Sequence, residues 1–198
     1  EASDIKYAAE NGYAIKLLGI AKRSGNLLEL RVHPTLIPRT HLLANVGGVY
    51  NAVFVKGDLV GDNLFYGKGA GSLPTASAVV SDIVAIAKSI GAEDSVENEM
   101  RFKKDVKGVK DMKSVKTRYY IRFSAVDKPG VLAKVSGVLA KYGISIATVS
   151  QKERNVSQIV PVVVMTHEAL ERDMAKALKE IDSFSVIKNR SVRIRVED

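Results

Sequence analysis

Cysteine is absent from the 198-residue sequence. This absence excludes disulfide bonds and thiolate metal ligands, and it is compatible with a reducing cytoplasm. Long apolar runs are also lacking, because the longest strongly apolar stretch, residues 159–165, is far shorter than the roughly 18 residues of a membrane-spanning helix. No signal-peptide pattern opens the sequence. We therefore expect a soluble, cytoplasmic protein with no membrane partner.

Several catalytic patterns are missing as well. The sequence has no His-x-x-His pair, no carboxylate cluster and no nucleophile elbow. His33 precedes Pro34 at the end of an expected strand, and His41 opens a helical turn. Structural roles are therefore favoured for both histidines, although histidine titrates near neutral pH and binds metals. We expect no metal site.

The basic residues are concentrated in one segment. The formal net charge is +8, which raises the question of nucleic-acid binding. Residues 98–118 hold eight lysines or arginines against three acidic residues, and Phe102 is their only aromatic residue. Such a charge run between domains is typical of a solvated linker, so we expect no nucleic-acid partner.

An apolar, strand-like run breaks into glycines within residues 66–76 and then continues as a helix. Glycine lacks a Cβ atom and tolerates positive φ, so backbone N–H groups can turn toward a ligand there. Ser72 or Thr75 can cap the helix start. N–H groups at a helix N-terminus favour anions or polar ligand atoms. The glycines are Gly67, Gly69 and Gly71.

This stretch does not fit the dinucleotide fingerprint G-x-G-x-x-G. The third glycine would fall at position 72, which is a serine, and the helix ending near Ile90 runs into Gly-Ala-Glu-Asp and not into an apolar strand. The residues alone therefore leave a ligand-binding loop and a simple glycine turn as open alternatives.

The first half of the chain alternates strand and helix patterns. Strand-like runs flank turns at residues 24–26 and 56–58, and the run over 28–34 alternates apolar and polar residues. A helical period follows the glycines, with one apolar face expected to pack onto the strands. The expected elements are a helix over 3–10, strands over 13–22, 28–34, 51–55 and 59–66, and a helix over 73–90.

The second half repeats a known order of elements. Its apolar periodicity predicts βαββαβ, the ferredoxin-like arrangement, and the fold class of the whole chain is α+β with an antiparallel or mixed sheet. The expected elements are strands over 119–126, 144–150, 157–166 and 184–196 and helices over 131–139 and 167–181.

Residues 45–82 resemble the C-terminal part of the catalytic region of homoserine dehydrogenase. The resemblance is carried by the ordered motifs Asn45–Val53, Gly57-Asp58, Gly61, Tyr66–Gly71 and Pro74–Asp82. It implies that the glycine loop lies beside the nicotinamide of NAD or NADP and beside the amino-acid substrate. It also implies that the catalytic residues lie upstream of Glu1. The implied cofactor-binding residues are Gly67, Gly69, Ala70, Gly71 and Thr75.

Residues 127–132, residues 143–146 and Gln151 resemble the ACT domain, a regulatory module that binds amino acids at a strand–helix turn facing another copy. Free N–H groups after Gly130 can receive a carboxylate, while Asp127 can attract an ammonium group or merely cap the helix. The implied effector-binding residues are Asp127, Gly130, Val131, Ile144, Ser145 and Ile146.

Together the resemblances imply three segments: part of a catalytic and dimerisation domain over 1–97, a basic linker over 98–116 and an ACT domain over 117–198. The implied activity is NAD(P)-dependent interconversion of homoserine and aspartate 4-semialdehyde in threonine and methionine biosynthesis. Threonine is the expected effector and a homo-oligomer the expected assembly, while the chain alone is expected to be inactive. The alternative is a non-catalytic amino-acid-binding regulator whose first half is only a dimerisation sheet.

Overall fold

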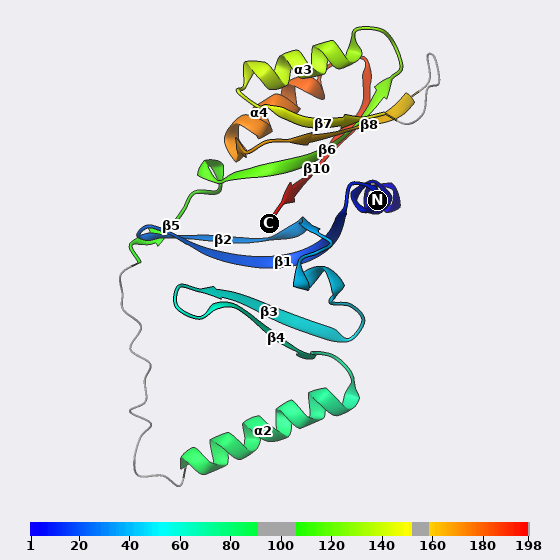
Figure 1. Cartoon of the computed structure of the whole chain (residues 1–198). Helices are drawn as coiled ribbons and strands as arrows, with labels where there is room; N and C mark the ends of the chain where they lie inside the picture. Colours follow the sequence, from blue (N-terminus) through cyan, green and yellow to red (C-terminus); the bar gives the residue numbers. More distant parts are fainter. Residues whose placement is uncertain (91–105, 152–158, 198) are drawn as a thin grey trace. The chain divides into compact units, whose positions relative to one another are not determined.

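The computed structural model describes residues 1–90, 106–151 and 159–197 (Figure 1). The chain divides into two compact units. The first comprises Glu1–Arg39 and Asp105–Asp198, and the second comprises Thr40–Lys104. Each unit is described by itself.

The first unit opens with a helix and a long hairpin. Helix α1 (Ala2–Glu10) is followed by β1 (Tyr13–Ser24) and β2 (Leu27–Pro38), which pair antiparallel along their whole length. The turn between the strands requires a left-handed residue, and Gly25 supplies it with φ of 61°. The helix and the hairpin expected from the sequence are confirmed.

The rest of the first unit has the βαββαβ order. The four long strands lie in the order β10-β6-β8-β7, and α3 and α4 lie on one face of this sheet (Figure 1). The ferredoxin-like prediction is confirmed. The elements are β6 (Lys116–Val126), α3 (Val131–Lys141), β7 (Ile146–Ser150), β8 (Ile159–Thr166), the short β9 (Ala169–Leu170), α4 (Glu171–Ile181) and β10 (Ile187–Val196).

The main core lies between this sheet and its two helices. Alternate residues of β6, namely Tyr119, Ile121 and Phe123, are almost fully buried against apolar side chains of α3 and α4 such as Leu139 and Met174. The two-residue period of β6 and the helical period of α3 and α4 therefore meet in one apolar layer.

The hairpin belongs to the same sheet, since β2 pairs with β10 in parallel at Thr35 and Leu36. The described part of the expected linker is also structured: β5 (Gly108–Val109) pairs with β2, and a short helix, η2 (Met112–Ser114), follows. The cause is backbone pairing, because the N–H of Lys107 donates to the carbonyl of Asn26 at 2.7 Å. The compact units thus cut across the expected segments, whose limits stay a prediction.

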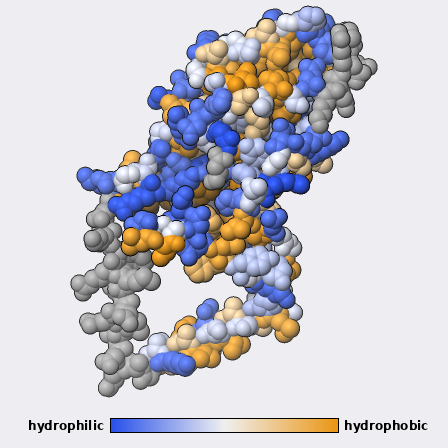
Figure 2. Space-filling view, in the orientation of Figure 1, coloured by the Kyte–Doolittle hydropathy of each residue, from blue (hydrophilic) through white to orange (hydrophobic). Residues whose placement is uncertain are grey.

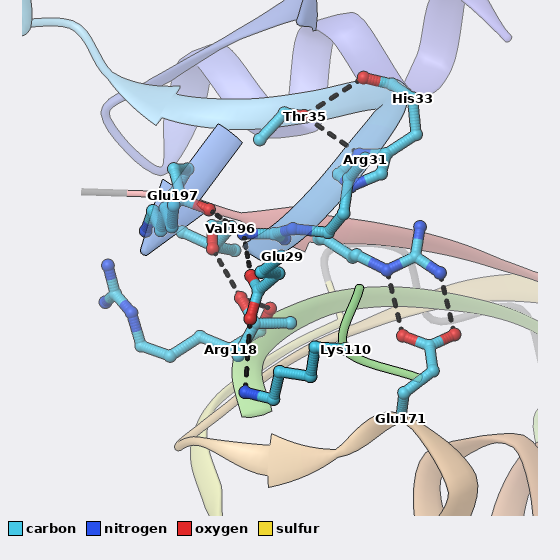
Figure 3. A network of polar contacts seen from close by, with 12 residues as sticks. Glu29, Arg31, His33, Thr35, Lys110, Arg118, Glu171, Val196 and Glu197 are labelled. Carbon is cyan, nitrogen blue, oxygen red and sulfur yellow. Dashed lines mark hydrogen bonds and ion pairs between the residues drawn. The ribbon is translucent and has the colours of Figure 1, made fainter. Parts of the chain in front are cut away.

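The two faces of β2 are exposed in an unexpected way. The polar Glu29 and Arg31 are buried, whereas Leu30 and Val32 are 50% and 78% exposed. Arg31 Nη2 lies 2.8 Å from both Glu29 Oε1 and Glu197 Oε2 (Figure 3). The alternation expected from the sequence is present, but at Glu29 and Arg31 ion pairs and not apolar packing cover the inner face of this strand.

The second unit holds η1 (Leu42–Asn45), the hairpin of β3 (Tyr50–Gly57) and β4 (Gly61–Lys68), and the long helix α2 (Ser72–Ile90). The elements are as predicted. The expected packing of α2 onto the strands is not, because none of its residues is buried.

Helix α2 carries an uncovered apolar stripe, visible in Figure 2. By length and composition alone, its 19 residues are apolar enough to cross a membrane. The absence of long uninterrupted apolar runs did not reveal this helix, because serines, a threonine and Asp82 interrupt its apolar residues. Core helices of soluble proteins pass the same test, so the absence of a membrane partner stays a prediction. The exposed residues include Leu73, Val79, Val80, Ile83, Val84, Ile86 and Ile90.

Candidate functional sites

The glycine loop joins β4 to α2. The helix begins at Ser72, so neither Ser72 nor Thr75 is the cap that the sequence suggested. Gly71 precedes the helix with φ of +114°, and its carbonyl accepts a hydrogen bond from the N–H of Thr75 at 3.1 Å. A residue with a side chain is strained in that conformation, so Gly71 is required by the backbone.

The other two glycines have different surroundings. A Cβ atom on Gly69 would overlap the side-chain amide of Asn51 and lie 3.1 Å from the Cβ atom of that residue. The N–H of Gly69 donates to the carbonyl of Val49 at 3.0 Å, so it is already used within the unit. A Cβ atom on Gly67 would have no other atom within 4 Å. Gly67 therefore has open space beside it, and Gly69 is packed.

A second candidate site lies where β6 meets α3. A cavity of about 400 Å³ is bounded by the end of β6, the following turn, the start of α3 and part of β8. Asp127, Gly130 and Val131, all predicted from the sequence, lie in its wall. These three residues are therefore brought together.

Asp127 does not cap α3, so that alternative is wrong. The residue at the N-cap position is Gly130, with φ of 87°, and no side chain accepts a hydrogen bond there. Asp127 Oδ1 instead accepts a hydrogen bond from Gln151 Nε2 at 3.3 Å. Asp127 Oδ2 is buried and has no hydrogen-bond partner within the described residues. A buried carboxylate oxygen without a partner is costly, and a bound cationic group would relieve that cost.

The N–H of Val131 is not free, as it donates to the carbonyl of Lys128 at 3.3 Å. A ligand carboxylate would therefore depend mainly on the other N–H groups of the first helical turn, which lack partners at any helix start.

Ile144, Ser145 and Ile146 do not line the cavity. Ile144 is buried in the main core, and the carbonyl of Ser145 accepts a hydrogen bond from the N–H of His167 at 2.9 Å. The physical reason is the strand order: β7, which begins at Ile146, is separated from β6 by β8. The cavity of a single chain therefore lacks these three residues among its lining, and their contact with a ligand at a seam with another copy stays a prediction.

The sequence analysis did not assign the apolar wall of the cavity. Every second residue at the end of β6 and in β8 faces it, and that two-residue period was the signal available. The apolar lining includes Phe123, Ala125, Leu132, Val135, Val160 and Val162.

Both tested histidines have structural contacts. His41 Nδ1 accepts a hydrogen bond from the N–H of Leu43 at 3.1 Å at the start of η1. His33 Nδ1 lies 3.0 Å from Thr35 Oγ1. Burial, and then the positive charges of Arg195 and Arg31, lower the pKa of His33, so the ring is neutral near pH 7.

A buried ionic cluster ties α4 to β6 and β10. Glu171 accepts two hydrogen bonds from Arg195, at 2.8 and 2.7 Å, and one from the hydroxyl of Tyr119 at 2.8 Å. Burial alone would raise the pKa of Glu171, but these bonds and the charge of Arg193 outweigh it and lower that pKa. The cluster is structural, and it fixes the start of α4.

Comparison with known families gives a class for each of the two segments that hold the candidate sites. Residues 119–185 match the ACT domain family, which defines the class of the βαββαβ part. Residues 1–84 match the homoserine dehydrogenase family. The chain thus combines a segment that matches the homoserine dehydrogenase family with a segment that matches the ACT domain family.

Individual relatives support this assignment. The chain is 41% identical to the homoserine dehydrogenase of Neisseria gonorrhoeae and 40% identical to that of Pseudomonas aeruginosa, spanning 46% of the length of each. A crystal structure of the homoserine dehydrogenase from Thiobacillus denitrificans matches 99% of the chain with a TM-score of 0.80 and 45% identity, over 45% of its own length. The Staphylococcus aureus enzyme at pH 7.0 matches with a TM-score of 0.59 and 28% identity.

Proposed function

We propose that this chain is part of an NAD(P)-dependent homoserine dehydrogenase whose activity is controlled by an amino acid bound to the ACT domain. The proposed reaction is homoserine plus NAD(P)⁺ giving aspartate 4-semialdehyde, NAD(P)H and a proton. The observation that carries the proposal is the family match of residues 1–84 together with the relatives that align over the whole chain.

The loop from Gly67 to Thr75 is the proposed contact with the cofactor. When bound, the nicotinamide supplies hydride transfer to or from the carbon that bears the homoserine hydroxyl. The loop fits this role in one respect, because the space beside Gly67 is open and α2 begins directly after Gly71. Gly69 contributes by allowing close packing against Asn51, so that Gly67, Ala70 and Gly71 remain as groups that can face a ligand.

Turnover tests the loop. In a complete dehydrogenase that contains this chain, Gly67→Ala should lower kcat/KM at least about tenfold, since a methyl group would fill the space left for the nicotinamide. The melting temperature should stay unchanged, because the fold itself leaves that space open. Normal kinetics in a stable Gly67→Ala enzyme would remove the loop from the cofactor site.

The same assay addresses the chain by itself. Because the chain spans 46% of the length of its relatives, we expect no homoserine-dependent change in absorbance at 340 nm from the 198-residue chain alone. Robust turnover would show that the catalytic groups lie within this chain.

The cavity beside Asp127 is the proposed effector site. It offers a carboxylate oxygen that has no partner among the described residues, a helix start and an apolar wall. These features suit the ammonium, the carboxylate and the side chain of one amino acid. Threonine is the proposed ligand because it is an end product of the proposed pathway, and a cavity of about 400 Å³ is large enough to hold it. Calorimetric titration of the chain with threonine, isoleucine, methionine and lysine tests this site and ranks the ligands.

Self-association is also proposed. Strand β7 is an edge of the sheet, and an uncovered edge strand readily pairs with another copy. Such pairing would bring residues 144–146 of a second copy toward the ligand. Sedimentation of the chain should give a dimer or a tetramer, and a monomer at high micromolar concentration would contradict this assembly.

A further inference from the structure

Strand β6 contacts two different parts of the first unit through its two faces. Phe123 and Ala125, on the helix side, line the cavity proposed for the effector. Tyr120 and Arg122, on the opposite side, reach helix α1. The same strand therefore touches both the ligand cavity and the N-terminal helix.

The contact with α1 is a buried ionic cluster around Asp4. Arg122 donates to the two oxygens of Asp4, from Nε at 2.7 Å and from Nη2 at 3.1 Å, and the hydroxyl of Tyr120 donates at 2.9 Å. Asp4 is 1% and Arg122 7% exposed. A two-pronged arginine–carboxylate pair of this kind holds one relative geometry, because both bonds are lost when either partner rotates.

The strand between the two contacts is stiff. It pairs with β8 in unbroken register from Tyr120 opposite Met165 to Val126 opposite Ile159. Val126, which lines the cavity, lies four positions along the strand from Arg122, a distance of about 13 Å. A displacement at the cavity end is therefore carried along the continuous ladder with β8, while the register shifts in the pairing with β10 lie opposite residues 122–125 on the other edge of the strand.

The two partners come from different family segments. Asp4 lies in the part matched by homoserine dehydrogenase, and Arg122 lies in the ACT domain. Helix α1 leads directly into β1 at Tyr13. The Asp4–Arg122 pair thus directly links the segment that matches the ACT domain family to the segment that matches the homoserine dehydrogenase family.

We propose that the Asp4–Arg122 ion pair couples occupancy of the cavity to the docking of α1 on the sheet. This inference rests on the proposed effector site. A ligand that binds between the end of β6 and α3 orders that end of the strand, fixes the Arg122 fork and tightens α1 on the sheet. Because coupling is reciprocal, docking of α1 also strengthens ligand binding.

Hydrogen exchange and calorimetry on the 198-residue chain test this coupling between the cavity and α1. With saturating threonine, the α1 amides should exchange about fivefold or more slowly in the wild type. In Asp4→Asn the change should fall below about twofold, and the Kd for threonine should rise about fivefold. Glu180→Gln is the matched control, because it removes an exposed ion pair with Lys141 in the same domain and should behave as the wild type.

Arg122→Lys is the second variant, for the case that Asp4→Asn does not fold. It keeps the charge and loses the fork, so it should also lose most of the α1 response. The coupling would be contradicted if threonine bound the wild type without any change in α1 exchange. It would also be contradicted if folded Arg122→Lys kept the full response, and in both cases the proposed effector site would remain supported. If none of the four amino acids gave a heat of binding, the proposed effector site would be contradicted, and the coupling that rests on it would be contradicted as well.

Discussion

The side chain of Asn51 occupies the space that a Cβ atom on Gly69 would need. Asn51 lies on β3 and pairs with Gly67 on β4, so its amide reaches past the strand end to the loop. Gly67 itself has open space, and Gly71 is held at positive φ. The three glycines of one motif are therefore required for three different reasons, of which only the space at Gly67 is available to a ligand.

The first prediction separates these reasons by stability. Gly69→Ala should destabilise the β3–β4 hairpin by about 1–3 kcal/mol, because the added methyl group displaces Asn51. Gly67→Ala is the matched control and should change stability by less than about 0.5 kcal/mol. Hydrogen exchange of the β3 and β4 amides measures both values. Equal protection in the two variants would mean that Asn51 moves aside without cost.

The order of the elements could be predicted from the sequence because each carries a local signal. Apolar residues compatible with a strand indicated β1, alternation indicated β2, helical spacing indicated α2 and α3, and Gly25 and Gly130 indicated turns. The pairing of β2 with β10 and of β5 with β2 could not be predicted, since backbone pairing between distant segments leaves no local pattern. The basic residues near 110 suggested a solvated linker, yet Lys110 pairs with the buried Glu29 at 3.2 Å.

The candidate site was predictable to a similar degree. The turn at Asp127 and Gly130 was found because glycine and proline punctuate the chain there, and both residues line the cavity. Residues 144–146 lie outside the cavity of a single chain because β8 separates β7 from β6, so their contact with a ligand at a seam between two copies stays a prediction. Asp4 and Arg122 were not singled out at all, because an ion pair between residues so far apart in the sequence gives no signal in either segment.

The second prediction concerns the Glu171 cluster. Glu171→Gln leaves Arg195 and Arg193 without their carboxylate and should cost about 3–5 kcal/mol of unfolding free energy. Glu168→Gln is the matched control three residues earlier, where an exposed ion pair with Lys116 contributes at most about 1 kcal/mol. Urea unfolding followed by circular dichroism measures the difference. Equal midpoints for the two variants would show that the buried cluster adds no net stability.

The third prediction concerns the loss of stability at acidic pH. Burial raises the pKa of Asp4, but the hydrogen bonds from Arg122 and Tyr120 outweigh it, so the folded-state pKa lies below the ordinary value of 3.8. Because the pKa is lower in the folded state, the stabilisation is complete above the unfolded pKa, and it is lost as the pH falls through the folded one.

The contribution of Asp4 and Glu171 to the unfolding free energy should therefore be constant above about pH 5. It should fall below about pH 4, where these two carboxylates take up protons. Asp4→Asn should be less stable than the wild type at pH 7 and should show a shallower decline between pH 5 and pH 2. Urea unfolding at a series of pH values checks this, and an unchanged slope in Asp4→Asn would assign the acid sensitivity to other carboxylates.

The fourth prediction concerns the carboxylate in the cavity. Asp127→Asn keeps the shape of the side chain and the acceptor for Gln151, and it removes the charge that would meet a ligand ammonium. Charge-assisted hydrogen bonds contribute about 1.5–3 kcal/mol, so the Kd for the bound amino acid should rise at least about tenfold. Gln151→Ala is the matched comparison, because it removes only the hydrogen bond to Asp127 Oδ1 and should raise the Kd less. Calorimetry on both variants decides the matter, since unchanged affinity in Asp127→Asn with a folded domain would move the ammonium to another part of the cavity.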